Sequence, residues 1–338
     1  MLKKDGWKYE NYLKLKELLD SSQSGDYIVT DWDNSAAIFD VEESAFLYQL
    51  ENFLYKLTPE EFREVLKKDM EEDNIDLNLY DRIVDELCDD YEKIYGDELL
   101  INSTLHREFI NKMMYYYMEF SKNLSYKTQC HRITYLFKNF TEEQLFNLGT
   151  ETVLEMTKRE LRKVKYKAKF KFGEVETIKS VGLKEIPQIS NLFNSFRKKG
   201  VNIYICSASL AIVVSSFATN DKFNYGFKKE DIYGLELLKD ENGKFIAEID
   251  NTHLTYMEGK AKVIEMLESK HNRKPLLYIG DSKGDYNALT YDGLKVGLII
   301  NRNTSGKIND LKEGRIKNST TYLLQDRDES IGEFVSST

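Results

Sequence analysis

The stretch 26-DYIVTDWDNS-35 is an apolar run that ends in two aspartates separated by one tryptophan. Side chains alternate along a β-strand, so Asp31 and Asp33 are expected to point the same way and Trp32 to point into the core. Two neighbouring carboxylates are unfavourable unless a positive group lies beside them. The stretch therefore predicts a buried strand that presents two acidic groups to a cation.

The composition is that of an ordinary globular protein. The chain has 338 residues, of which 41% are hydrophobic and 31% charged, enough for about two domains. The formal net charge of -9 disfavours a nucleic-acid binder, which needs a basic face. The sequence has no run of about 20 apolar residues, hence no membrane span, and its first residues lack the apolar core of a signal peptide. We expect a cytoplasmic protein, although an exported protein without its leader would look the same.

The chain divides by pattern into two kinds of region. Residues 41–180 contain helical runs, two capping boxes that begin at Thr58 and Thr141, and no convincing alternating segment. From residue 183 onward, helical patterns alternate with short apolar runs. Residues 7–20 fit an amphipathic helix, with these leucines near one side: Leu13, Leu15, Leu18 and Leu19.

Continuous apolar runs between helices favour a parallel sheet covered on both faces. The predicted fold class is therefore α/β, with a Rossmann-like parallel-sheet core formed by residues 1–40 and 181–338. A helical domain, residues 41–180, is expected to be inserted after the first strand. Within the core, we expect strands at 201–209, 275–282 and 295–300, a hairpin formed by 231–238 and 244–250, and helices at 186–196 and from about Gly259.

Six polar residues follow or flank these apolar runs. Each could cap a helix or be a solvated charge when considered alone. The carboxyl ends of parallel strands, however, lie at one edge of a sheet, where ligands bind, so we expect the six to converge. Hard oxygen ligands suit Mg²⁺, and a Mg²⁺ with open positions suits a phosphate. The six residues are Asp31, Asp33, Ser207, Lys260, Asp281 and Asp285.

These motifs, in the order D-x-D, strand-ending serine, lysine and G-D-x-x-x-D, resemble the haloacid dehalogenase superfamily, specifically its phosphatases. The resemblance covers about half of the chain and implies that residues 41–180 form the family's cap. The segments 31-DWDNS-35 and 280-GDSKGDYNALT-290 look most like phosphorylcholine phosphatase and phosphoserine phosphatase relatives. Ser35 is a departure, because a threonine usually follows the asparagine, but the hydroxyl is kept.

The resemblance implies roles for the four acidic residues. Asp31 would be the nucleophile that forms an aspartyl-phosphate and would also bind Mg²⁺. Asp33 would protonate the leaving alcohol and then activate water, while its backbone carbonyl binds the metal. Asp281 would complete the protein ligands of the metal. Asp285 would support the loop or the ion's water shell.

The same resemblance implies that the Ser207 hydroxyl and the Lys260 ammonium group bind the phosphate. Ser207 would donate a hydrogen bond to a phosphoryl oxygen, and Lys260 would neutralise charge on the phosphate and on Asp31. Lys262 is the alternative lysine, but Lys260 directly follows Gly259 at the expected helix start. The implied activity is Mg²⁺-dependent hydrolysis of a small phosphomonoester.

The cap is expected to select the substrate. Glu42 and Glu43, together with the Met and Tyr cluster at 113–118, would suit a cationic substrate such as phosphorylcholine. The alternative for the cluster is core packing, and for the glutamates a solvated first helical turn. Phosphoserine, or another small phosphorylated metabolite, remains the alternative substrate. A non-catalytic ligand-binding protein on the same core is the competing functional class, and the oligomeric state stays open.

Overall fold

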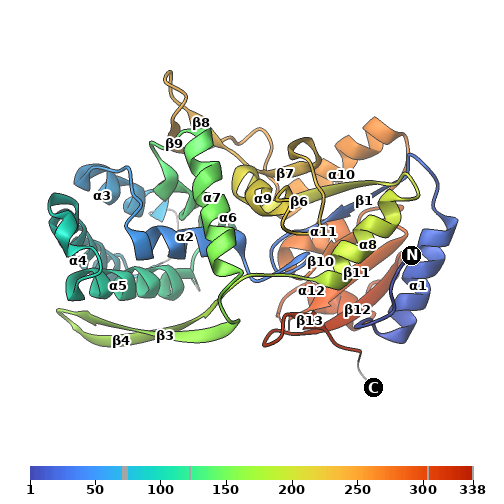
Figure 1. Ribbon diagram of the computed structural model, residues 1–338, viewed down its shortest axis with the longest axis horizontal. Coiled ribbons are helices and arrows are strands. Elements are labelled where there is room, and N and C mark those ends of the chain that lie inside the picture. Colours follow the sequence, from blue (N-terminus) through green and yellow to red (C-terminus); the bar gives the residue numbers. More distant parts are fainter. Residues whose placement is uncertain (71–74, 122, 303, 337–338) are drawn as a thin grey trace.

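The computed structural model describes residues 1–70, 75–121, 123–302 and 304–336. Its centre is a seven-stranded sheet with the order β13-β12-β11-β10-β1-β6-β7 (Figure 1). All neighbouring strands are parallel except β13, which runs antiparallel to β12. The predicted α/β fold class is confirmed. The strands are β1 (Tyr27–Thr30), β6 (Asn202–Leu210), β7 (Ile232–Leu235), β10 (Leu277–Gly280), β11 (Val296–Asn301), β12 (Thr321–Asp328) and β13 (Glu333–Phe334).

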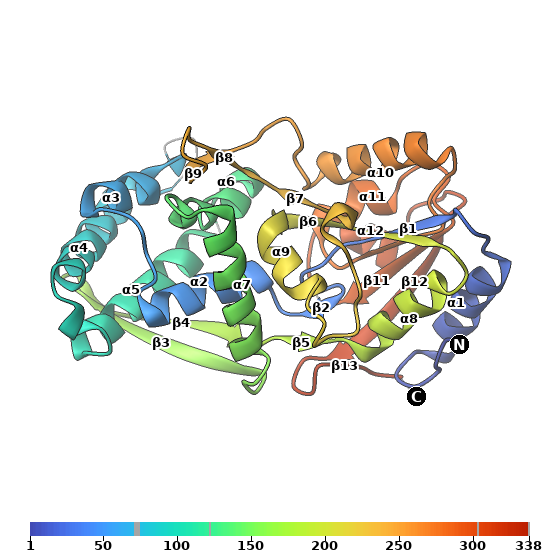
Figure 2. The same cartoon turned by 45° about the horizontal axis from the view of Figure 1, so that its top comes forward.

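Helices cover both faces of this sheet (Figure 2). Side chains of β1 alternate between the two faces, since Ile28 packs into one apolar cluster and Tyr27 and Val29 into the other. Trp32 is fully buried, as expected. Leu13 was expected on the apolar side of the first helix but is 46% exposed, because it lies off the stripe that contacts the sheet. One face is covered by α1 (Tyr9–Ser21), α8 (Pro187–Arg197) and α9 (Ala211–Ala218), the other by α10 (Glu258–His271), α11 (Tyr286–Leu289) and α12 (Ile308–Lys312).

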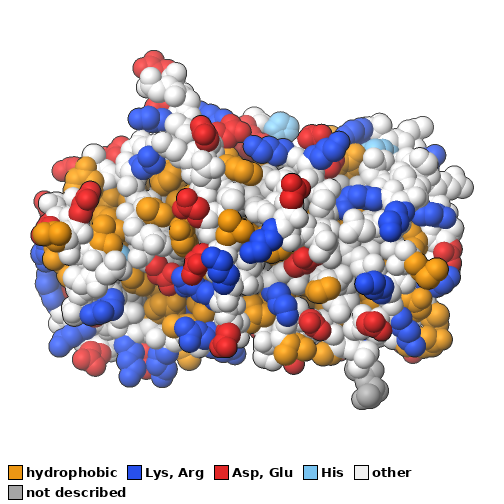
Figure 3. Space-filling model, viewed as in Figure 1, with side chains coloured by type: hydrophobic (Ala, Val, Ile, Leu, Met, Phe, Trp, Pro, Cys, Tyr) orange, Lys and Arg blue, Asp and Glu red, His pale blue; other side chains and the backbone are white. Residues whose placement is uncertain are grey.

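The inserted region contains the expected helices, and the capping boxes at Thr58 and Thr141 are both formed. It also contains a long antiparallel hairpin, β3 (Arg162–Phe170) and β4 (Gly173–Val181), where no strand was expected. Lysines alternate along β3 with the buried Tyr166, Ala168 and Phe170. The charged residues make the segment look polar in the sequence, so its apolar face was not recognised. Figure 3 shows basic side chains gathered over this hairpin. The helices are α2 (Val41–Asn52), α3 (Pro59–Lys67), α4 (Leu77–Gly96), α5 (Thr104–Ser121), α6 (Tyr126–His131) and α7 (Glu142–Met156), with short 3₁₀ turns η2 (Glu98–Leu100) and η3 (Thr134–Phe137).

The chain leaves and re-enters the core at one place. There β2 (Ala37–Ile38) pairs antiparallel with β5 (Lys184–Glu185), close to the boundaries predicted at residues 40 and 181.

The predicted hairpin of 231–238 and 244–250 forms only in part. β7 instead joins the central sheet beside β6, and only β8 (Leu237–Lys239) pairs with β9 (Phe245–Ile249). Among the helices of the described residues, none is both long and apolar enough to cross a membrane.

Candidate active site

A buried lysine bridges two aspartates at the carboxyl edge of the sheet. Lys260 Nζ donates hydrogen bonds of 2.7 Å to Asp31 Oδ1 and to Asp285 Oδ1. Burial lowers the pKa of Lys260, but the charges of Asp285 and Asp31 outweigh it and hold the pKa well above its usual value. Lys260 thus supplies the positive charge expected beside Asp31, but its second partner is Asp285 rather than Asp33. Lys262, the alternative, is exposed.

Three carboxylates around this lysine form a set that could hold a metal ion. Oxygen atoms of Asp31, Asp281 and Asp285 lie within 4.8 Å of one another, and all three residues are buried. Ser35 Oγ donates to Asp31 Oδ2 at 3.1 Å and to Asp281 Oδ1 at 3.3 Å. Burial and the charge of Asp285 raise the pKa of Asp31, against the effect of Lys260. A bound divalent cation would reverse that shift, and oxygen ligands of this type suit Mg²⁺.

Gly280 allows Asp285 to fold back onto the loop. A Cβ at residue 280 would lie 2.6 Å from Asp285 Cβ, so a side chain there is excluded. Asp285 Oδ2 accepts hydrogen bonds of 3.1 Å from the backbone N–H groups of Asp281 and Ser282, and the Tyr278 hydroxyl donates to Oδ1 at 2.8 Å. Burial raises the pKa of Asp285, yet Lys260 and these N–H groups lower it overall. Asp285 therefore stabilises the loop as a carboxylate.

Asp33 lies in a separate polar niche between β1 and β6. Its Oδ1 accepts from the backbone N–H of Val41 at 2.7 Å, and its Oδ2 accepts from Ser209 Oγ at 2.7 Å and Ser207 Oγ at 3.3 Å. Burial, opposed by these hydrogen bonds, raises the pKa of Asp33 to about 7. A carboxyl group with such a pKa can both release and take up a proton near neutral pH.

The niche contains one residue that the sequence reasoning missed. Ser209 lies two residues beyond Ser207, and alternation along a strand places both on the same face. The strand expected at 201–209 already contains Ser209, so this alternation is the signal that could have identified it. Ser207 does not cap the following helix, because β6 continues to Leu210 and α9 begins at Ala211.

Arg302 is a second missed residue. It follows β11, and its Nη1 donates to Asp281 Oδ2 at 2.6 Å. Thr304 Oγ1 donates to the Asp281 backbone carbonyl at 3.2 Å. The position of Arg302 just past the carboxyl end of a parallel strand is the signal that could have found it.

The two glutamates expected to bind substrate are already engaged with the protein. Glu42 Oε1 accepts the backbone N–H of Leu210 at 2.8 Å, at the start of α9. Glu43 accepts a 2.8 Å hydrogen bond from the Tyr117 hydroxyl and forms an ion pair with Lys179 of β4. Of the 113–118 cluster, four side chains are buried in the cap core, which supports the packing alternative: Met113, Met114, Tyr116 and Tyr117.

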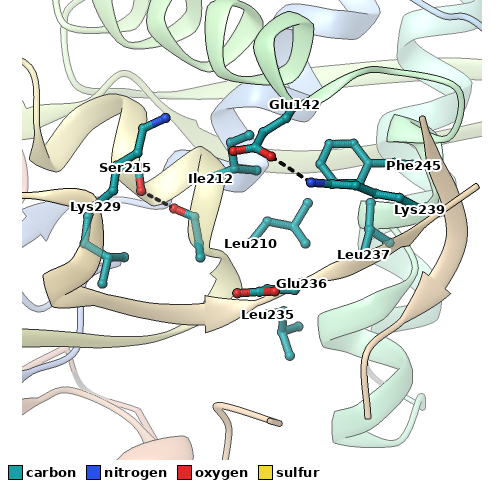
Figure 4. Close-up of a pocket in the computed structure, with 12 residues that line it drawn as sticks. Glu142, Leu210, Ile212, Ser215, Lys229, Leu235, Glu236, Leu237, Lys239 and Phe245 are labelled. Carbon is teal, nitrogen blue, oxygen red and sulfur yellow. Dashed lines mark hydrogen bonds and ion pairs between the residues drawn. The ribbon is translucent and has the colours of Figure 1, made fainter. Parts of the chain in front are cut away.

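A pocket of about 210 Å³ lies between α7, α9, β7 and β8 (Figure 4). Leu210, Leu235 and Phe245 contribute apolar walls, and a 2.7 Å ion pair joins Lys239 and Glu142. None of the six predicted residues lines it, so the chemistry is not centred there.

No family model matches the sequence, and no curated protein matches it. A conserved functionally unknown protein from Anaerococcus prevotii DSM 20548 is similar in structure, with a TM-score of 0.87 and 28% identity over 99% of this chain and 97% of that one. A HAD family hydrolase from Salmonella enterica serovar Typhi has a TM-score of 0.41 and 11% identity over 88% and 74% of the two chains. A substrate-bound phosphoserine phosphatase has a TM-score of 0.41 and 9% identity over 82% and 87%.

The likeness to the Anaerococcus prevotii protein shows that the two chains share a fold over nearly their whole length. Likenesses at these identities show the fold alone. The chemistry that is possible at the carboxyl edge of this sheet therefore follows from the side chains that lie there.

Proposed function

We propose that this chain is a Mg²⁺-dependent phosphatase of small phosphomonoesters that reacts through an aspartyl-phosphate on Asp31. The observation that carries the proposal is the buried bridge from Lys260 to Asp31 and Asp285, with Asp281 beside it. A charged lysine at this depth is unfavourable unless it serves anionic groups. Asp31, Asp281 and the backbone of Asp33 would hold the ion, which supplies Lewis-acid stabilisation of the phosphoryl oxygens.

The two aspartates divide the reaction between them. An Asp31 oxygen attacks phosphorus, the ester P–O bond breaks, and the departing alkoxide takes the proton of Asp33. Water then attacks the aspartyl-phosphate, Asp33 recovers a proton from that water, and the P–O bond to Asp31 breaks to release phosphate. The raised pKa of Asp33 supports this alternation, because the residue must carry a proton in the first step and accept one in the second.

A cavity of about 190 Å³ lies at the junction of core and cap; none of the six predicted residues lines it, but its small volume is compatible with a small substrate. Asn34, directly after Asp33, lines it together with Glu43, Lys179 and Arg302. Because Glu43 is paired with Lys179, the cavity presents both signs of charge rather than a free anionic site. This arrangement favours a substrate with a polar or zwitterionic alcohol group over phosphorylcholine, whose alcohol carries a quaternary ammonium. Phosphorylcholine as substrate stays a prediction to be tested.

The test is hydrolysis of a panel of phosphate esters, including an aryl phosphate, phosphoserine and phosphorylcholine, with Mg²⁺ and with a chelator. We expect turnover that requires metal and is lost in Asp31→Asn, whereas Asp20→Asn, an exposed substitution on α1, leaves it unchanged. Full activity in Asp31→Asn would refute the mechanism. Calorimetric binding of an ester without any turnover by the wild type would instead indicate a non-catalytic binding protein.

A further inference from the structure

The short cap helix α6 rests directly on the loop that carries the metal-site carboxylates. Tyr126, the first residue of α6, projects toward Gly284 in the 3₁₀ turn η5 (Lys283–Asp285). A Cβ at residue 284 would lie 2.2 Å from the Tyr126 hydroxyl oxygen and 3.1 Å from its Cζ. The hydroxyl therefore occupies the space in which a side chain at residue 284 would stand.

The backbone does not explain the glycine at residue 284. Eleven glycines of the described chain have a positive φ, which side chains rarely tolerate, and Gly284 is not one of them. Any L-residue could adopt its conformation. What excludes a larger residue is the room taken by Tyr126, so the glycine and the tyrosine form a complementary pair across the two domains.

Other contacts of α6 reach the same two catalytic segments. The Tyr126 ring lies 5.9 Å from the ring of Tyr256, which precedes the helix that carries Lys260, and Lys283 Nζ lies 5.2 Å from the centre of the Tyr126 ring. His131, at the far end of α6, packs its ring 5.6 Å from Tyr256. One small helix thus contacts the segments that directly precede Lys260 and Asp285 in the sequence.

We infer that Tyr126 is a positioning residue that the cap contributes to the core: by filling the space above Gly284 it fixes the 281–285 loop and the start of α10 in their relative places. Contact between cap and core then sets the geometry of Lys260 and Asp285. The catalytic part of this inference rests on the proposed phosphatase function, whereas the contact itself does not.

The test compares Gly284→Ala, Tyr126→Phe and the double variant. The added methyl should collide with the Tyr126 hydroxyl and separate α6 from the loop, and removal of that hydroxyl should relieve the collision. Deuterium uptake without substrate is the first readout. We expect Gly284→Ala to raise uptake in peptides covering 124–133 and 281–289, and the double variant to return to the level of Tyr126→Phe. Gly96→Ala is the matched control, because no atom lies within 4 Å of its new Cβ.

The second readout is kcat at saturating ester and Mg²⁺. Gly284→Ala should lower kcat about 10- to 100-fold, as small misplacements of catalytic groups do, and the double variant should recover most of it. Normal uptake in Gly284→Ala, or a double variant no better than the single one, would overturn the inference. Coupled uptake in a protein with no esterase activity would support the cap–loop contact and refute the proposed function instead.

Discussion

Replacement of Lys260 by methionine tests the site most directly, because the unbranched apolar stem is largely kept while the charge and the N–H donors are lost. Lys260 is 2% exposed and donates two hydrogen bonds of 2.7 Å, to Asp31 and Asp285. Hydrogen bonds to charged partners are worth about 1.5–3 kcal/mol each. Breaking a buried ion pair by removing one partner costs about 3–5 kcal/mol. Both figures place the loss of unfolding free energy near 4 kcal/mol.

The assay is urea or thermal unfolding in chelator, followed by the same measurement in Mg²⁺. We expect Lys260→Met to be less stable by about 4 kcal/mol, equivalent to a Tm lower by about 6 °C at an unfolding entropy of about 2.1 cal/mol/K per residue. Mg²⁺ should return part of that stability, because it supplies positive charge to the same carboxylates. Hydrolysis of the aryl phosphate should fall by a factor of about 10²–10³, as it does when a preorganised electrostatic group is removed.

The matched control is Lys262→Met, two residues along the same helix and exposed. It should change neither stability nor turnover measurably, since exposed charges contribute little. Equal effects of the two substitutions, or an unchanged Tm in Lys260→Met, would refute the reasoning that Lys260 balances a buried anionic cluster.

Substitutions at three further positions probe the neighbouring residues. Glu42→Gln should keep the hydrogen bond from the Leu210 N–H and leave KM unchanged. Glu42→Ala should lower the unfolding free energy by about 1–3 kcal/mol, because the buried N–H is left without a partner. A large rise of KM in Glu42→Gln would instead support the expected role of Glu42 in substrate binding. Lys179 and neighbouring donors overcome the effect of burial and lower the pKa of Glu43 below 4.5, so the pair stabilises the wild type above that pH and this contribution is lost as the pH falls. In Lys179→Met, burial should raise the pKa of Glu43. Urea unfolding at pH 4 and pH 7 should then show a smaller loss of unfolding free energy at pH 4 than in the wild type. Arg302→Gln removes a cation that competes with Mg²⁺ for Asp281. Because an ion pair of this exposure is worth up to about 1 kcal/mol, calorimetry should show Mg²⁺ binding up to about fivefold tighter. Weaker Mg²⁺ binding would show instead that Arg302 supports the ion.

The cluster of Asp31, Lys260 and Asp285 could be predicted because topology brings these residues together. Apolar runs indicate parallel strands, parallel strands end at one edge, and residues that follow them must meet there. Asp31, Lys260 and Asp285 meet in this way although they are far apart in the chain. Ser209 lies within the strand expected at 201–209 and Arg302 lies just past the end of β11, but neither residue was considered at the level of the sequence.

Other features depend on partners that the sequence does not specify. Glu42 and Glu43 read as free acidic groups, yet a backbone N–H from β6 and a lysine from β4 engage them. The β3–β4 hairpin was missed because the apolar residues of β3 alternate with lysines and are buried by a tertiary contact with α5. In both cases tertiary contacts decide the outcome over local pattern.

The β8–β9 hairpin bears on how the two domains can separate. Phe245 of β9 exchanges backbone hydrogen bonds of 2.8 Å with Asn139 and Phe140, just before α7 of the cap. The β8–β9 hairpin thus forms two backbone hydrogen bonds with the inserted region, at a point distant in sequence from β2 and β5. Any displacement of the inserted region relative to the sheet would have to break these two bonds or carry the hairpin along, so the hairpin restricts such a displacement.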